Sequence, residues 1–339
     1  MAYLAQRHRA FLLIAFLLIL PRPLRGQGSD TLVAKLADPD WVVRSAAVAA
    51  LNQMSDADLP AGYAAAAIDL LAREVDETWN AEGPVGEGYG EYLIDVVLLV
   101  LRTGDPDAVR PLAFLGIDVS VGARRFLARH PDRALPALEE AWREHWPLRS
   151  DIVPTLGEML LADRNGEIRL TETQRRIIDR RLFVAAFDSV PNSRYAFVET
   201  VGEVVLPEWT PVVASLAEND TIAHDRWSFI QGAAQRYRAP LEAARSALSD
   251  LAMLAALQRL HRMVCDDEAQ GARFGQCTAL ASHLANAERQ LRAGRRIPGR
   301  AQIDAYLRGL DRSAAQGIFT TREYVLLSGN ASALLDRLN

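Results

Sequence analysis

A short stretch near the middle of the chain carries side chains that could ligate calcium. The segment LADRNGEIRLTE, residues 161–172, places carboxylate and amide oxygens at Asp163, Asn165 and Glu172. Such oxygens are the ligands that Ca²⁺ prefers in proteins. Gly166 lies among them, where a sharp turn needs a residue that accepts positive φ. The segment therefore predicts either a calcium loop or a plain helix–turn–helix.

The same segment resembles the loop of the EF-hand family when it is aligned on its glycine and on Ile168. The resemblance implies that Asp163, Asn165 and Glu172 take the third, fifth and twelfth loop positions. The first position, where the family has an aspartate ligand, is Leu161. We assign no metal ligand and keep these three side chains as calcium candidates.

The two cysteines of the chain, Cys265 and Cys277, allow two interpretations. In an oxidising compartment a pair at this spacing most simply forms a disulfide. With His261 and His283 the same cysteines could instead hold zinc, because His261 and Cys265 lie one helical turn apart. The remaining spacings match no zinc module, so we predict a Cys265–Cys277 disulfide.

Two further clusters have a functional and a structural interpretation. The glycines of EGYGEY, residues 87–92, suggest a phosphate-binding loop, but its acids and the lack of a preceding strand favour a plain connection between helices. Trp142, His145 and Trp146 form WREHW, whose aromatic pair could bind a sugar ring or a partner's side chain. Packing of these rings between helices is the more usual arrangement.

The elements that carry these residues are predicted to be helices throughout. The chain is 50% hydrophobic and 7% aromatic, and its periodicity is helical with no alternating strand. Capping boxes begin helices at Thr171 and Thr320. Near the N-terminus, Asp38 suits an N-cap, Pro39 the first helical position and Asp40 the positive helix terminus. The apolar face of the helix that follows is built mostly from small residues, namely Val42, Val43, Ala46, Ala47, Ala50, Leu51 and Met54.

Residues 32–54 resemble a HEAT repeat, and the positions that carry the likeness are Asp38, Pro39, Val43, Arg44, Ala47, Ala50 and Leu51. In that family a Val-Arg pair near the start of the second helix packs against the neighbouring repeat and bridges to it. The resemblance implies this role for Val43 and Arg44. A shorter copy, GDPDAVR at 104–110, carries the likeness over 104–117 and implies a similar role for Val109 and Arg110. We expect a HEAT-like α-solenoid of helical hairpins over residues 29–238.

Residues 239–339 predict a C-terminal four-helix bundle. Its first helix is expected to run from Pro240 to about Cys265, and later helices end at Gly294 and Gly317. Within it, residues 268–338 resemble the FIMAH domain, a small helical module of exported bacterial proteins, at Leu280, Leu284, Ala287, Leu291, Gly294, Ala301, Leu307, Leu310, Gly317, Ile318, Asn330, Ala331 and Leu334. This resemblance implies no chemistry.

Residues 1–28 are predicted to be a signal peptide. Arg7 and Arg9 precede an apolar run at 10–20, which is too short to cross a bilayer and which Pro21 ends. Cleavage is expected near residues 26–28, with export to the periplasm or the outside of the cell. Removing residues 1–28 takes away four arginines and no acid, so the formal charge moves from −5 to −9. Nucleic acid, an anionic membrane surface and stable membrane insertion of the mature chain are therefore not expected.

The sequence carries no HExxH, no GxSxG and no Cys–His nucleophile pair. We assign no catalytic residue and no cofactor, and we interpret the chain as a non-enzymatic exported scaffold that binds a protein or peptide partner. Because distant carboxylates can meet in a fold, the alternative is an exported enzyme or glycan-binding protein with a site in the concave face of the solenoid. Lys35 is the only lysine, an excess of arginine that we interpret as codon bias.

Overall fold

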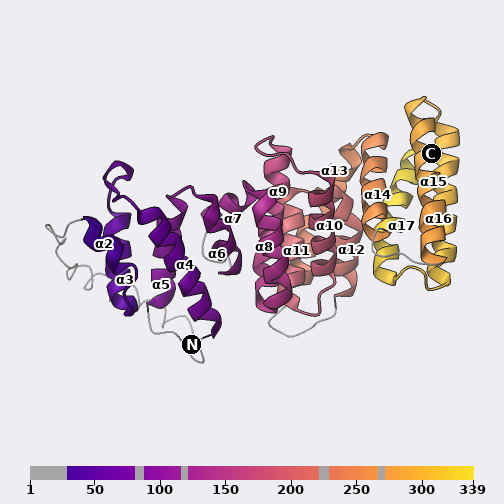
Figure 1. Cartoon of the computed structure of the whole chain (residues 1–339). Coiled ribbons are helices and arrows are strands. Elements are labelled where there is room, and N and C mark those ends of the chain that lie inside the picture. Colours follow the sequence, from indigo (N-terminus) through magenta and orange to yellow (C-terminus); the bar gives the residue numbers. More distant parts are fainter. Residues whose placement is uncertain (1–28, 81–87, 116–120, 221–228, 266–271) are drawn as a thin grey trace. The chain divides into compact units, whose positions relative to one another are not determined.

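The protein is helical in every part that its structure describes. The structure is a computed structural model, and it describes residues 29–80, 88–115, 121–220, 229–265 and 272–339. The regular elements of these ranges are α-helices, several of them preceded by a single 3-10 turn (Figure 1). The prediction of an all-α, HEAT-like solenoid is confirmed. The chain divides into two compact units, one up to Pro111 and the other from Leu112 on.

The first unit contains α2 (Ser29–Lys35), α3 (Trp41–Asn52), α4 (Tyr63–Asn80) and α5 (Tyr89–Leu101). α3 packs against α2 and α5, and α5 also packs against α4. Residues at helical spacing form the shared core, including Val48, Leu51, Leu71, Val96 and Leu99, all fully buried. Each such side chain stabilises the fold by about 1.5–3 kcal/mol through removal from water.

The buried face of α3 differs from the predicted one. Arg44, Ala47, Val48 and Leu51 are buried, whereas Val42 is 56% exposed. The face is displaced because Arg44, which the hydrophobic pattern places on the polar side, lies in the core and sets the phase of the helix. The prediction that Val42 packs inward is therefore wrong.

The N-cap of α3 also lies later in the Asp-Pro-Asp motif than predicted, at its second aspartate. Asp40 is the N-cap, and its carboxylate accepts from the Val42 amide at 2.9 Å. Asp38 accepts from the Asp40 amide at 2.9 Å and so holds the approach to the cap. In the second copy the first aspartate does cap, since Asp105 accepts from the Asp107 amide.

Within the described residues, eight helices precede the C-terminal bundle in the sequence of the second unit. They are α6 (Val109–Phe114, which crosses the boundary), α7 (Val121–Ala128), α8 (Pro131–Glu144), α9 (Arg149–Arg164), α10 (Glu172–Ala186), α11 (Pro191–Val204), α12 (Thr210–Asn219) and α13 (Phe229–Ala247). α11 packs on α9 and α13, and α7 packs on α9. Gly157 and Gly202 allow this closeness, because a Cβ at either would collide with Thr200 or Tyr237.

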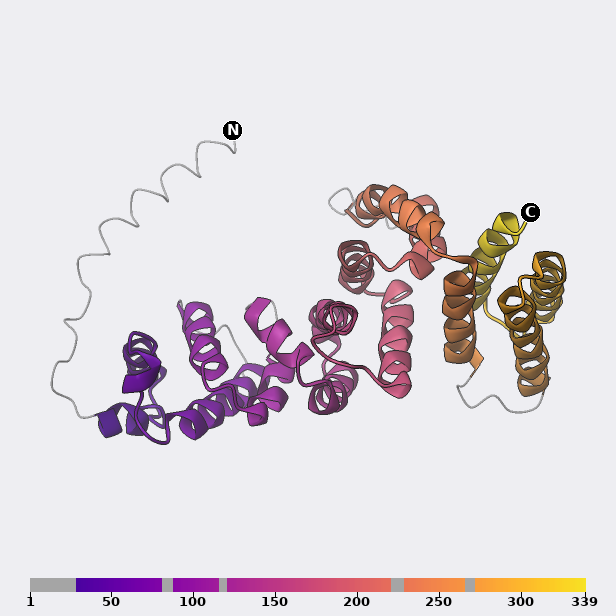
Figure 2. The ribbon, with the colours of Figure 1, turned by 90° about the horizontal axis from the view of Figure 1, so that it is seen from above.

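The chain ends in a bundle of α14 (Asp250–Cys265), α15 (Ala272–Arg292), α16 (Arg296–Ala315) and α17 (Thr321–Arg337) (Figure 2). α14 packs on α15 and α17, and α16 packs on the same two helices, which closes the bundle. Thr320 forms the predicted capping box with Glu323. Gly294 and Gly317 follow the ends of α15 and α16 with φ of +71° and +70°.

The start of the bundle differs from the prediction. α13 continues through Pro240 to Ala247, and the helix break comes at Leu248 and Ser249, where the Ser249 hydroxyl accepts from the Ala252 amide. The single long helix from Pro240 to Cys265 is therefore wrong, and the expected boundary at 238/239 falls inside α13. Pro240 lies inside α13 even though a proline removes one helical hydrogen bond, and Leu241 beside it is buried. None of the described helices is long and apolar enough to cross a membrane.

Candidate functional site

A buried cluster of charged side chains joins α3 to α4 in the first unit. Arg44 is 1% exposed, and its guanidinium lies 2.7 Å from the Glu74 carboxylate and 3.0 Å from that of Glu77. The same guanidinium donates to the carbonyls of Asp38 and Pro39 at 3.0 and 2.9 Å. Arg44 therefore ties the turn before its own helix to the next helix, which is the bridging role that the HEAT resemblance implies.

Two tyrosines of α5 complete the shell around Glu74. The hydroxyls of Tyr89 and Tyr92 donate to its carboxylate at 2.5 and 2.7 Å, and the Trp41 rings pack on both phenol rings. Burial, together with the bond to Glu74, raises the pKa of both tyrosines above the usual range. Both oxygens of Glu74 are satisfied, so the cluster is a closed structural network and not a site open to a ligand.

The shorter copy of the motif does not repeat this cluster. Val109 is buried in the brief helix α6, while Arg110 lies on the surface and Val43 of the first copy is only half-buried. Of the two implied Val-Arg pairs, only Arg44 has a buried bridging guanidinium.

Arginines also cap the C-terminal ends of neighbouring helices, a role that the sequence did not reveal. Arg73 donates to the Leu36 carbonyl just after α2 at 2.6 Å. Arg102 donates to the carbonyls of Leu51 and Met54 at the end of α3, at 3.0 and 2.7 Å. The planar guanidinium can serve several carbonyls at once, which a lysine ammonium does less well. Part of the arginine excess, first interpreted as codon bias, is thus used structurally.

The three calcium candidates are held by different partners. Asp163 accepts from the Leu170 amide at 2.9 Å and pairs with Arg175 at 3.3 Å. Glu172 pairs with Arg262 at 2.9 Å, and Asn165 points its amide at a neighbouring glutamate at 3.5 Å. Among the described residues no three His, Cys, Asp or Glu side chains gather in a way that could hold a metal ion.

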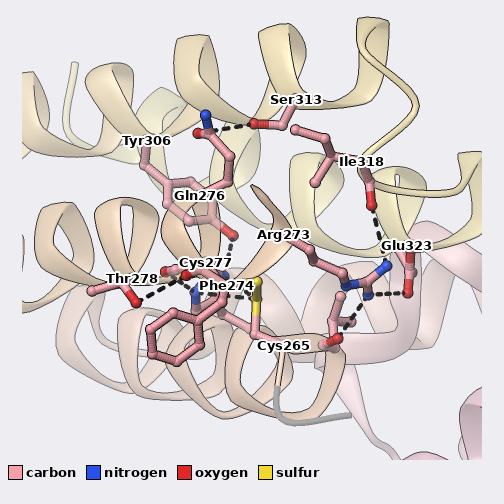
Figure 3. The surroundings of a disulfide bond; sticks show 12 residues. Cys265, Arg273, Phe274, Gln276, Cys277, Thr278, Tyr306, Ser313, Ile318 and Glu323 are labelled. Atoms are coloured by element: carbon pink, nitrogen blue, oxygen red, sulfur yellow. Dashed lines mark hydrogen bonds and ion pairs between the residues drawn. A yellow bond between two sulfur atoms is a disulfide. The ribbon is translucent and has the colours of Figure 1, made fainter. Parts of the chain in front are cut away.

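The predicted disulfide is present and joins the end of α14 to α15 (Figure 3). Cys265 and Cys277 are bonded with their Cα atoms 5.8 Å apart, which rules out the zinc alternative for these sulfurs. His261 is buried beside the bond, where its Nε2 donates to the Cys277 carbonyl at 3.1 Å and its Nδ1 accepts from the Tyr306 hydroxyl at 3.3 Å. The histidine is therefore a satisfied core residue.

Arg273 connects three helices of the bundle at the end that carries the disulfide (Figure 3). Its guanidinium donates to the carbonyls of Val264 and Ile318 at 2.9 and 3.1 Å and to the Glu323 carboxylate at 2.7 Å. Three helices thus meet at one side chain, close to the disulfide.

The other sequence clusters take structural roles where they are described. Gly88 is the N-cap of α5 at φ +90° and Gly90 lies inside that helix, while residues 81–87 lie outside the described part. Trp142 is 3% exposed, with the guanidiniums of Arg149 and Arg181 over its ring at 5.6 and 5.3 Å. The side chain of Trp146 also lies outside the described part. Core packing, and not an exposed aromatic pair, is confirmed for Trp142.

The structure brings together two carboxylates that are distant in sequence, Asp179 of α10 and Glu208 of the 3-10 turn before α12. Arg259 of α14 binds both, at 2.7 Å from Asp179 and closer still to Glu208. Burial raises the pKa of Asp179, and Arg259 opposes the rise. Through Arg259 the pair anchors α14 to α10 and to the turn before α12.

One cavity, of about 490 Å³, lies where the end of α10 meets α11, α12 and the start of α17. Its charges are largely satisfied within the protein. Arg194 binds the Asp220 carboxylate through two nitrogens, at 2.9 and 3.3 Å, and the guanidinium of Arg322 lies over the Phe187 ring at 5.3 Å. The cavity thus presents paired groups and one stacked guanidinium.

Comparison with known protein families finds a likeness in one part of the chain. Residues 30–57 match the HEAT repeat. The match covers α2, α3 and the turn after them, and so includes Arg44 with the carbonyls that it binds. No curated protein and no solved structure matches the chain.

Proposed function

We propose that this protein is an exported scaffold that binds a protein or peptide partner over the surface of its helical repeats, without turning a substrate over. The observation that carries the proposal is the HEAT repeat at 30–57, set in a chain that is helical throughout its described part. HEAT repeats commonly mediate protein interactions. Stacked helices of this kind offer extended surfaces on which many weak contacts add up.

Charge suggests what kind of partner the surface favours. Without residues 1–28 the chain carries a formal charge of −9. Exposed acids such as Asp76, Glu91 and Glu144 have no ion pair among the described residues. A basic partner would be steered toward such a surface, and salt would weaken the association. The bundle α14–α17 is proposed to act as an accessory module of the exported chain.

The alternative, an exported enzyme or glycan-binding protein, would need a site that reaches solvent. The carboxylate pair described above, Asp179 with Glu208, is buried and bound by Arg259. We therefore favour binding over catalysis.

The proposal is tested with the full chain, tagged at its C-terminus, in the cells that produce it. N-terminal sequencing of the mature protein should begin near residues 26–28, and the protein should fractionate with the envelope. A captured partner, once purified, should bind reversibly and more weakly as salt is raised. Neutralising Asp76, Glu91 and Glu144 to their amides should slow association, while the matched change Arg300→Gln on the exposed side of α16 should not.

Two outcomes would contradict the proposal. One is a mature chain that keeps residues 1–20 in the cytoplasm. The other is hydrolysis of a generic ester, peptide, phosphate or glycoside substrate that co-purifies with the protein and disappears in Glu208→Gln.

A further inference from the structure

A second cavity, of about 200 Å³, lies between α7 and the last turns of α9. Ala128, Leu161 and Ala162 supply its apolar lining, and the other lining residues are charged or carry an amide. Arg125 and Arg129 stand one turn apart on α7, Glu158 lies on α9, and Asn165 with Glu167 belongs to the turn that follows α9. One small cavity is therefore faced by two cations and two anions.

These charges do not satisfy one another. Within the described part of the chain, Arg125, Arg129 and Glu158 have no side-chain hydrogen bond and no ion pair, and Glu167 has only the long bond from the Asn165 amide at 3.5 Å. In the first cavity, by contrast, Arg194 is paired with Asp220 and the guanidinium of Arg322 stacks on the Phe187 ring. Opposite charges that line one cavity without pairing are available to a ligand that carries both signs.

The turn that carries Asn165 and Glu167 is held rigidly. Gly166 adopts φ +75°, and the Glu167 amide returns to the Ala162 carbonyl at 2.9 Å, which closes the end of α9. Asp163 fixes the outgoing chain by accepting from the Leu170 amide. The residues that resemble a calcium loop therefore build a turn that presents one wall of the cavity, and a site on a rigid support loses little entropy on binding.

We propose that this cavity binds a single basic residue with a free carboxylate, namely a C-terminal arginine or lysine of a peptide or the free amino acid. The carboxylate would bind between Arg125 and Arg129, which can donate to it from two guanidiniums. The side-chain cation would bind Glu158 and Glu167. The cavity is smaller than the roughly 300–1,000 Å³ of drug-sized sites, which suits one residue. That the bound residue is the C-terminus of a peptide rests on the proposed function. That the cavity recognises a carboxylate and a side-chain cation does not.

Isothermal titration of the full mature chain tests this inference with Nα-acetyl-L-arginine, which mimics a C-terminal residue. We expect saturable binding with a Kd of about 1 mM. Nα-acetyl-L-argininamide, which lacks the carboxylate, and Nα-acetyl-L-leucine, which lacks the cation, should each bind at least about tenfold more weakly. Free L-arginine distinguishes the sources: binding of both arginine compounds indicates a peptide terminus, and binding of the free amino acid alone indicates an amino-acid site.

Charge-neutral variants locate the site. Arg129→Gln and Glu158→Gln should each weaken binding of whichever arginine compound binds by at least about tenfold. Neither should change the melting temperature, because neither side chain has a hydrogen-bond or ion-pair partner among the residues that the structure describes. Arg300→Gln and Asp336→Asn, at exposed positions that do not line the cavity, are the matched controls and should bind normally.

Absence of saturable binding by both arginine compounds would overturn the inference, as would binding that Arg129→Gln and Glu158→Gln leave unchanged. These failures are distinct from failure of the proposed function, which is judged by export and by capture of a macromolecular partner.

Discussion

Replacing Arg44 tests whether its buried ion pairs stabilise the helices of the HEAT repeat. Arg44→Ala removes a guanidinium that is 1% exposed and that bridges Glu74, Glu77 and the turn before α3. Removing one partner of a buried ion pair costs about 3–5 kcal/mol, because the other charge is left uncompensated. Here the hydroxyls of Tyr89 and Tyr92 still donate to Glu74. We therefore expect a loss near the lower limit, about 3 kcal/mol.

Hydrogen exchange of the full chain, followed by mass spectrometry, measures this loss locally. Protection of the amides in α3 should fall by roughly 100-fold, the equivalent of about 3 kcal/mol. Arg44→Lys keeps the positive charge, so it should lower the protection of α3 less than Arg44→Ala does. Some loss should remain, because lysine lacks the planar fork that reaches two carboxylates and two carbonyls. Arg300→Ala, at an exposed position, should change stability by less than about 0.5 kcal/mol.

Two results would refute this reasoning. If protection of α3 falls less than about threefold in Arg44→Ala, the buried network does not hold the repeat together. If stability is kept but binding of the partner is lost, Arg44 is a binding residue and the structural assignment is wrong.

Three more predictions follow from other parts of the structure. Because the folded pKa values of Tyr89 and Tyr92 are raised, the stability they give is complete below about pH 10 and is lost as pH rises beyond it; Tyr92→Phe should flatten that decline in urea titrations, and an unchanged decline would contradict it. Unreduced protein should show no free thiol, and replacing Cys265 and Cys277 by serine should cost about 2–3 kcal/mol, whereas two reactive thiols would disprove the bond. Asp163→Ala should cost about 1–2 kcal/mol through the lost amide and arginine contacts, and calcium should not shift the melting temperature; a calcium-dependent rise that this variant abolishes would restore the metal interpretation.

Features set by a few neighbouring residues were predictable from the sequence. The capping boxes at Thr171 and Thr320 are present, and Gly294 and Gly317 end their helices as expected. Each depends on residues within one or two turns of the chain, so the local pattern contains the information. The disulfide was predictable for a different reason, since the chain has only one pair of cysteines.

Features decided by packing between distant segments were not predictable. Asp38 and Asp40 are both good caps, and the docking of Arg44 on α4 selects the second. The hydrophobic pattern places an arginine on the exposed side of a helix. Because Arg44 is buried, the buried face of α3 is rotated from the predicted one. The unpaired charges around the second cavity come from α7 and α9, and no spacing along the chain reveals that Arg129 faces Glu158.

Site-specific photo-crosslinking in the producing cells tests the central claim, that the repeat surface binds a macromolecular partner. A photoreactive residue is placed in turn at exposed apolar positions, Val42 and Leu98 in the first unit and Tyr195 and Phe274 in the second. We predict that at least one of these positions gives a discrete adduct with the same envelope protein, and that high salt before irradiation reduces it. Irradiation that yields no discrete adduct at any of the four positions, in the fraction where the mature chain resides, would contradict the scaffold function.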